Sequence, residues 1–262
     1  EPKSVRNGIK GAVPKTARGL PSSIIEFYPE DGDPSSEDDE SFQNSLQLYK
    51  EFCKYKNDIV GAGNIDRYMY WYHFFKGQIE YAKLAIYRGA YEDEETRNPK
   101  LKNKIIRTWN KMMNHETQRI RNGNEIAIIA HLQRSVWDHI FRDQLEIEEI
   151  STAYDGASAL RAMPEISQIY MNENFEQKVL FIGNGKITDA KMHYRKLGSK
   201  DAFKRIDLIK VGNNIMKTEL VKPTEDFEYY LTGIIGGKTV TYPVTGGSTP
   251  GSINKTVITV EK

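Results

Sequence analysis

A stripe of cations in the middle of the chain is the strongest binding signal in the sequence. Its four members are spaced i, i+4, i+7 and i+11, so a helix places them on one face: Lys100, Lys104, Arg107 and Lys111. Helix-borne lysine and arginine can each meet a phosphate, and Arg119 and Arg121 extend the predicted nucleic-acid-binding set. Nearby rings such as Trp109 could stack on unpaired bases. The alternative is the solvated charged face of an ordinary amphipathic helix.

A dense aromatic run precedes the cations and covers more than one face of the helix that it predicts. Five of its residues form the predicted interface between subunits: Tyr68, Tyr70, Trp71, Tyr72 and Phe74. Core packing is expected for at least half of these rings, and a stacking platform for bases or sugars is a further interpretation. Tyrosine and tryptophan are enriched at protein interfaces, so an interface explains the surplus better than a cofactor does.

The five histidines do not complete a metal site. His115-Glu116 begins a zinc-protease motif, but Arg119 stands where the second histidine is required. His131 and His139 are eight residues apart, too far to chelate one metal without other ligands, and His73 and His193 have no partner by spacing. We therefore predict neither a metal nor a cofactor.

Familiar catalytic motifs are also incomplete in the sequence. Gly236-Gly237-Lys238-Thr239 resembles the end of a P-loop, but Thr232 replaces the first glycine and a strand-like segment follows. Cys53 lies on an apolar stripe, where a thiol is a poor nucleophile. We predict no catalytic residue.

One group of polar residues supports an enzymatic alternative. His193, Tyr194, Arg195 and Lys196 are residue types that metal-independent ribonucleases use for proton transfer and phosphate stabilisation. No second carboxylate or histidine is tied to this group by spacing, so an ordinary polar surface is the favoured interpretation.

The elements that must position these residues form an α+β chain in three parts. Residues 1–41 are rich in proline and read as an extended arm, 42–176 as an α-helical domain, and 177–262 as a small antiparallel β-sheet or sandwich. Helices are predicted from Ser41, over 65–91, from about residue 100 to 121, and on to about Glu149, with short helical pieces between 157 and 175. The segment 202–211 is ambiguous, and Gly236-Gly237 predicts a hairpin turn.

Composition sets limits on the class of protein. The 262 residues carry a formal net charge of +1, so contact with nucleic acid must come from local clustering. The one cysteine excludes an intrachain disulfide framework. No apolar run approaches the ~20 residues of a membrane span, and no signal-peptide pattern is present. Localisation stays open, with a virion or the cytoplasm favoured over secretion.

These features favour a non-enzymatic structural or assembly protein. We expect a homo-oligomer, such as a virus or phage coat or nucleocapsid-type subunit, that contacts nucleic acid through the basic helix face. Two alternatives remain: a metal-independent, toxin-type ribonuclease, and a secreted or surface binding module whose C-terminal strands form an immunoglobulin-like unit.

Overall fold

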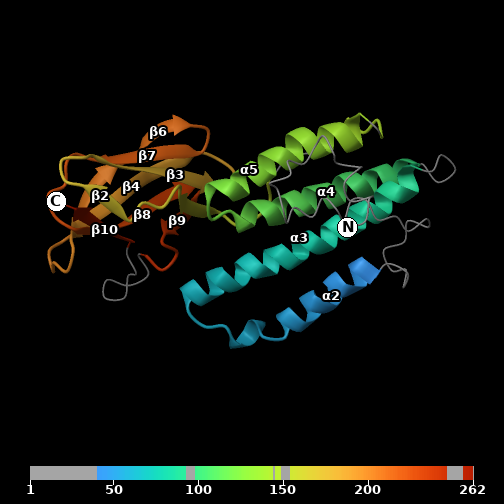
Figure 1. Ribbon diagram of the computed structural model, residues 1–262, viewed down its shortest axis with the longest axis horizontal. Coiled ribbons are helices and arrows are strands. Elements are labelled where there is room, and N and C mark those ends of the chain that lie inside the picture. Colours follow the sequence, from blue (N-terminus) through green and yellow to red (C-terminus); the bar gives the residue numbers. More distant parts are fainter. Residues whose placement is uncertain (1–39, 93–97, 144, 149–153, 247–255, 262) are drawn as a thin grey trace. The chain divides into compact units, whose positions relative to one another are not determined.

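The chain consists of helices followed by strands, which confirms the predicted α+β class (Figure 1). A computed structural model describes residues 40–92, 98–143, 145–148, 154–246 and 256–261. The predicted arm, 1–41, lies outside these residues except for its last two, which begin the first described helix. Two compact units are present, a helical unit and a strand unit, and the strand unit includes Gly61–Asp66, Ile120–Gly123 and the described residues from Tyr154 onward.

Sequence periodicity predicted the long helices well. The helices are α2 (Glu40–Cys53), the short 3₁₀ turn η2 (Lys56–Asp58), α3 (Ala62–Glu92), α4 (Pro99–Arg119), α5 (Gly123–His131) and the π-helix η3 (Leu132–Arg142). Helix α3 begins three residues before the predicted Ile65, because Gly61 adopts a positive φ of 87° and its carbonyl accepts the Ile65 N–H at 2.9 Å. Helix α4 begins after Asn98, whose side chain accepts the Leu101 N–H at 3.0 Å.

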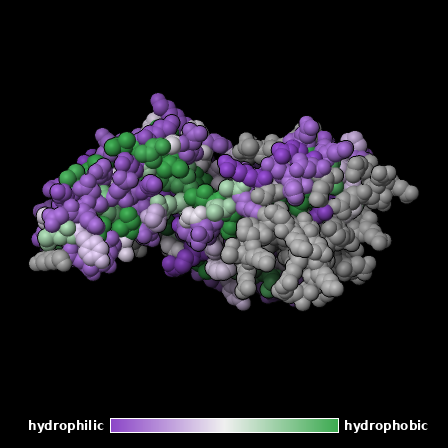
Figure 2. All heavy atoms as spheres, turned by 45° about the horizontal axis from the view of Figure 1, so that its top comes forward, coloured by the Kyte–Doolittle hydropathy of each residue, from purple (hydrophilic) through white to green (hydrophobic). Residues whose placement is uncertain are grey.

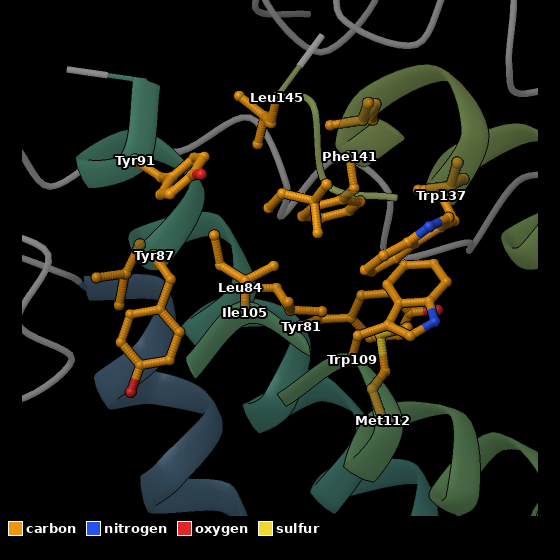
Figure 3. Close-up of a cluster of buried hydrophobic side chains, with 14 of the residues drawn as sticks. Tyr81, Leu84, Tyr87, Tyr91, Ile105, Trp109, Met112, Trp137, Phe141 and Leu145 are labelled. Carbon is orange, nitrogen blue, oxygen red and sulfur yellow. The ribbon is translucent and has the colours of Figure 1, made fainter. Parts of the chain in front are cut away.

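The core of the helical unit is built around stacked and tilted rings (Figure 3). Trp109 of α4 lies 4.9 Å from Trp137 and 5.4 Å from Phe141, both of η3, measured between ring centroids. Tyr81 of α3 and Met112 of α4 are also fully buried in this cluster. Cys53, whose place on an apolar stripe predicts burial, is only half-buried at the end of α2.

The strand unit contains two sheets. The strands are β1 (Ala159–Ala162), β2 (Gln168–Tyr170), β3 (Phe175–Ile182), β4 (Ile187–Lys196), β5 (Lys204–Asp207), β6 (Ile209–Gly212), β7 (Ile215–Leu220), β8 (Phe227–Ile235), β9 (Lys238–Tyr242) and β10 (Thr256–Glu261). One sheet has the order β1-β3-β7-β6, and the other β2-β10-β8-β4-β5 with β9 paired to β8.

The two sheets face each other across one apolar core. Phe175 and Phe181 from the first sheet are buried in the same cluster as Met192 and Tyr229 from the second. Among the described strands, all pairings are antiparallel except that of β2 with β10. The order β1-β3-β7-β6 matches strands A, B, E and D of an immunoglobulin-type sandwich, and β10-β8-β4 matches its strands G, F and C. Strands β2 and β5 extend the second sheet at its two ends. Strand β9 is an additional strand that lies between β8 and β10 in the sequence.

Figure 2 shows apolar residues grouped on an otherwise hydrophilic surface of the strand unit. Large exposed apolar side chains in this unit include Ile209, Val211 and Ile215, on or beside β6 and β7.

Long-range strand pairing decides the structure of two segments for which the sequence predicted helices or was ambiguous. The short helices predicted between 157 and 175 are wrong: β1 and β2 lie there, because Leu160 and Ala162 pair with Phe181 and Val179 of β3 and are buried. The ambiguous segment 202–211 is β5 and the start of β6, which belong to different sheets. Between them Leu208 is buried, and its N–H donates to the Ala190 carbonyl at 2.9 Å.

The Gly236-Gly237 turn is confirmed. It joins β8 to β9, with φ of 57° at Gly236 and 78° at Gly237, the two positive values that a two-residue hairpin turn of type I′ requires. Strand β9 follows this turn, whereas a P-loop is followed by a helix.

Candidate nucleic-acid interface and neighbouring polar sites

Helix α4 presents the predicted cation stripe to solvent. All four members are exposed: Lys100, Lys104, Arg107 and Lys111. Within the described part of the chain none of the four forms an ion pair with a carboxylate. Helix α4 has six lysines and arginines and one glutamate, and eleven residues of helix separate the ends of the stripe by about 16 Å.

The opposite side of α4 holds the stripe in this orientation. Leu101, Ile105 and Met112 are buried against the rest of the helical unit, so the helix cannot rotate without exposing them. Trp109 belongs to this buried side with no exposed surface. It therefore has no free ring face for a base, and the suggestion that it stacks on nucleic acid finds no support in its position.

The two additional predicted cations are engaged inside the protein. Arg119 pairs with Glu116 at 2.6 Å, and its guanidinium lies over the rings of Phe74 and Tyr70 at 4.8 and 5.4 Å. Arg121 pairs with Asp66 at 3.0 Å in the strand unit. The structure thus separates the six predicted residues into four exposed cations and two that serve internal ion pairs.

Helix α3 adds cations beside the stripe that sequence spacing could not connect with it. The Nζ atom of Lys104 lies 5.4 Å from the centre of the Tyr87 ring on α3. Burial, followed by the charges of Lys76, Lys111 and Lys83, lowers the pKa of His115 to about 4. Lys83 is partly compensated by Glu80 at 2.9 Å. The positive surface therefore extends from α4 toward α3.

The predicted aromatic interface divides into buried and exposed rings. Tyr68 is buried and stacks on Phe52 at 4.4 Å, while Tyr72 is half-buried with its ring centre 5.7 Å from that of Tyr49. Tyr70 donates its hydroxyl to Glu125 at 3.0 Å. Trp71 is 50% exposed, and its ring meets the edges of Tyr70 and Phe74. Trp71 is the member of this set that offers a large surface to a partner.

Two of the histidines meet across helices. The Nδ1 atoms of His73 on α3 and His115 on α4 lie 3.0 Å apart. His139 is exposed and lies 3.8 Å from Asp143, and burial lowers the pKa of His131. Across the described residues no three His, Cys, Asp or Glu side chains gather in a way that could hold a metal ion.

The ribonuclease-like group does not converge on one point. Alternation along β4 places His193 and Arg195 on the outer face of the sheet, while Tyr194 packs with the sandwich core. His193 is buried, stacked on Tyr230 at 4.4 Å, and its Nε2 lies 2.9 Å from the Thr232 hydroxyl. Burial is also the main cause that lowers its pKa.

Sequence spacing ties no carboxylate to the group His193–Lys196, but the neighbouring strand β8 places one beside it. Glu228 of β8 is directly opposite Arg195, and the two form an ion pair at 2.5 Å. The Arg195 guanidinium also lies 4.3 Å from the centre of the Phe203 ring. Its Nη1 donates to the Asp201 carbonyl at 3.0 Å. Arg195 is thus held by three partners within the unit, as expected for a structural residue.

Comparison with known proteins gives no family for this chain. No protein-family model matches the sequence, and no curated protein matches it significantly. Among the helices that the structure describes, none has the combined length and apolar character needed to cross a bilayer.

Proposed function

We propose that this chain is a non-enzymatic, nucleic-acid-binding assembly protein whose α4 stripe contacts the phosphate backbone. The observation that carries the proposal is the set of four exposed cations, which have no carboxylate partner among the described residues: Lys100, Lys104, Arg107 and Lys111. Unpaired cations on a rigid helix release counterions from nucleic acid at little conformational cost. A helical surface merely solvated by charge would more often mix both signs.

The surroundings of the stripe favour backbone contact over base recognition. Trp109 is buried, and Trp71 is five residues from Lys76, which places them about 140° apart around α3. Tyr87, whose ring lies beside Lys104, is buried as well. Among the described residues, no exposed aromatic ring therefore interleaves with the stripe as stacking on unpaired bases would require. We expect weak sequence preference and a strong dependence on salt.

The proposal is tested by reversing two charges of the stripe. Lys104→Glu with Arg107→Glu should weaken binding of a fluorescent DNA duplex by about ten- to a hundredfold at low salt, measured by fluorescence anisotropy. Plotted against the logarithm of salt concentration, the affinity slope should fall by about two, one for each lost phosphate contact. Circular dichroism should remain unchanged, because both side chains are exposed.

A charge-matched control separates this site from general electrostatics. Lys50→Glu with Lys56→Glu changes the net charge equally at exposed positions of α2 and η2. This control should retain nearly full affinity. Equal losses in the two variants, or full retention by both, would contradict a nucleic-acid site on α4.

Assembly is the second part of the proposal. Trp71 is half-exposed within a group of rings whose other members are largely covered, a pattern that suits a contact between copies of the chain. The same chemistry suits a coat or nucleocapsid-type subunit, in which protein contacts and phosphate contacts act together.

A second candidate function rests on the strand unit. Its immunoglobulin-type strand order supports a binding module, since such sandwiches commonly carry recognition surfaces on their faces and loops. An export signal encoded upstream of Glu1 would favour this candidate over the assembly protein.

A further inference from the structure

Three charged side chains far apart in sequence meet inside the strand unit. Asp66 lies near the beginning of α3, Arg121 follows α4, and Arg161 belongs to β1. One oxygen of Asp66, Oδ1, accepts from an Nη2 of Arg121 at 3.0 Å and from an Nη2 of Arg161 at 3.3 Å. Two guanidinium groups therefore converge on one carboxylate oxygen.

Backbone carbonyls fix the orientation of both guanidinium groups. The Ile120 carbonyl accepts from Arg161 Nε at 2.9 Å and from Arg121 Nη1 at 2.9 Å, and the Leu160 carbonyl accepts from Arg161 Nη1 at 3.1 Å. Such contacts hold the planar donors in place before any ligand arrives. Binding would then cost little side-chain entropy.

The negative charge of Asp66 does not fully offset the cost of keeping the Arg161 guanidinium charged in its buried position. Its side chain is 8% exposed. Burial, and then the charge of Arg121, lower the pKa of Arg161 to about 10 in spite of the opposing effect of Asp66. Two other groups that face it are the hydroxyls of Tyr154 and Tyr242, which are neutral near pH 7. An anion beside Arg161 would offset this cost.

The cluster is partly open to solvent at its other two members. The side chains of Arg121 and Asp66 are 24% and 26% exposed. Both Nη2 atoms lie within hydrogen-bonding distance of the same Asp66 oxygen, so they are close enough for one ion to accept from both. Asp66 then acts as the internal competitor for those donors.

We propose that Arg121 and Arg161 form a binding site for a phosphate group. Arginine pairs suit this ligand because each guanidinium presents parallel N–H donors that match the oxygens of a phosphate. The site lies in the strand unit and does not depend on the α4 stripe. Its ligand is either free inorganic phosphate or a phosphate carried at the end of a nucleotide.

Isothermal titration calorimetry of the full chain tests this site. Inorganic phosphate, a 5′-phosphorylated trinucleotide and the same trinucleotide without the phosphate are titrated separately at constant ionic strength. Saturable binding of inorganic phosphate supports the site. Saturable binding of the phosphorylated trinucleotide, without binding of its unphosphorylated form, also supports it. The ligand that binds more tightly identifies the source of the phosphate. Absence of saturable binding for both phosphate ligands overturns it.

The proposed site predicts that substitutions of its arginines weaken phosphate binding and that substitution of its aspartate strengthens it. Arg121→Gln should weaken phosphate binding about tenfold, because one charge-assisted pair is lost, and Arg161→Lys should weaken it by loss of the planar fork. Asp66→Asn should strengthen binding about tenfold, because both guanidinium groups lose their competing carboxylate. A purely structural ion cluster would instead give an Asp66→Asn protein that is less stable and gains no affinity.

A matched control excludes a general charge effect. Arg205→Gln removes an exposed arginine from β5 of the same unit and should leave phosphate binding unchanged. Equal weakening by Arg205→Gln and Arg121→Gln would overturn the assignment. Far-ultraviolet circular dichroism confirms that each variant is folded, and retained binding by Lys104→Glu/Arg107→Glu distinguishes this site from the α4 stripe.

Discussion

The helical unit and the strand unit satisfy their buried polar groups in different ways. In the strand unit, the buried Gln177 amide donates to the carbonyls of Pro164 and Lys178 at 2.6 and 2.8 Å, and Arg161 donates to two carbonyls. Most of the buried side-chain atoms that have no hydrogen-bond partner among the described residues lie in the helical unit, including Tyr81 Oη and Glu116 Oε1, and only His193 Nδ1 and Thr256 Oγ1 lie in the strand unit.

The difference follows from how each element uses its backbone. A helix uses most of its own carbonyls in i→i−4 bonds, so few remain for side chains from a neighbouring helix. Strand ends, turns and bulges leave carbonyls available to side chains from elsewhere. The helical unit should therefore be the more sensitive of the two to pH and to changes in packing.

The largest expected effect is the loss of a ring from the helical core. Trp109→Ala should reduce the free energy of unfolding by about 3–5 kcal/mol, because Trp109 is fully buried against Trp137 and Phe141. All three tryptophans of the chain lie in the helical unit, so tryptophan fluorescence during urea unfolding reports on this unit alone.

The half-exposed tryptophan provides the control for this substitution. Trp71→Ala should cost less than about 1 kcal/mol and, if the proposed interface is right, lower the sedimentation coefficient of the assembled protein. Similar losses of stability in the two variants would show that burial does not separate them.

The next effect is a loss of stability of the helical unit at low pH. The pKa of His115 is about 4 in the folded unit, below the value near 6.5 of an unfolded chain, so the unfolded state binds more protons between these values. Stability of the helical unit should therefore fall by as much as about 3 kcal/mol as the pH drops from 7 to about 4. Urea unfolding followed by tryptophan fluorescence measures this dependence.

His115→Gln isolates the contribution of this histidine. The variant should show a flatter pH dependence, and the difference from the wild type removes the effect of Glu116, whose pKa is raised mainly by burial and whose influence has the opposite sign. An unchanged slope in His115→Gln would mean that the pair with His73 does not couple to folding.

A smaller effect than that of acid is expected at the close contact between α3 and α4. A Cβ atom at Gly77 would lie 2.7 Å from Glu116 Oε1, and Glu116 is held by Arg119 at 2.6 Å. Gly77→Ala should therefore cost about 1 kcal/mol, although alanine is the better helix former. In a Glu116→Ala background the same change should stabilise by about that amount. A loss of stability in both backgrounds would place the strain elsewhere.

Much of the helical unit was predictable because its key neighbours are close in sequence. The spacing of Lys100, Lys104, Arg107 and Lys111 fixed their common face, and Leu101 with Ile105 indicated the buried side. The turn at Gly236-Gly237 was likewise local. The contacts of Arg119 with aromatic rings were harder to predict, because those rings belong to α3 and lie 45 or more residues earlier in the sequence.

The strand unit was harder to predict because its partners are distant. Strands β1 and β2 resembled short helices until their pairing with β3 and β10 was known. Glu228 could not be assigned to Arg195 by spacing, since 33 residues separate them. The same is true of Arg161 and Asp66, which are 95 residues apart.

By itself the sequence determined the α+β order, the helix faces and the cation stripe, because a repeat of 3.6 residues is a property of the chain alone. Tertiary structure decided which of the six predicted cations are exposed on α4 and which form ion pairs inside the protein. It also brought two arginines and one aspartate together, because long-range register and packing cannot be read from local spacing. The four exposed cations of the α4 stripe and the paired arginines of the strand unit are similar in residue type, and they differ in the partners that folding supplies.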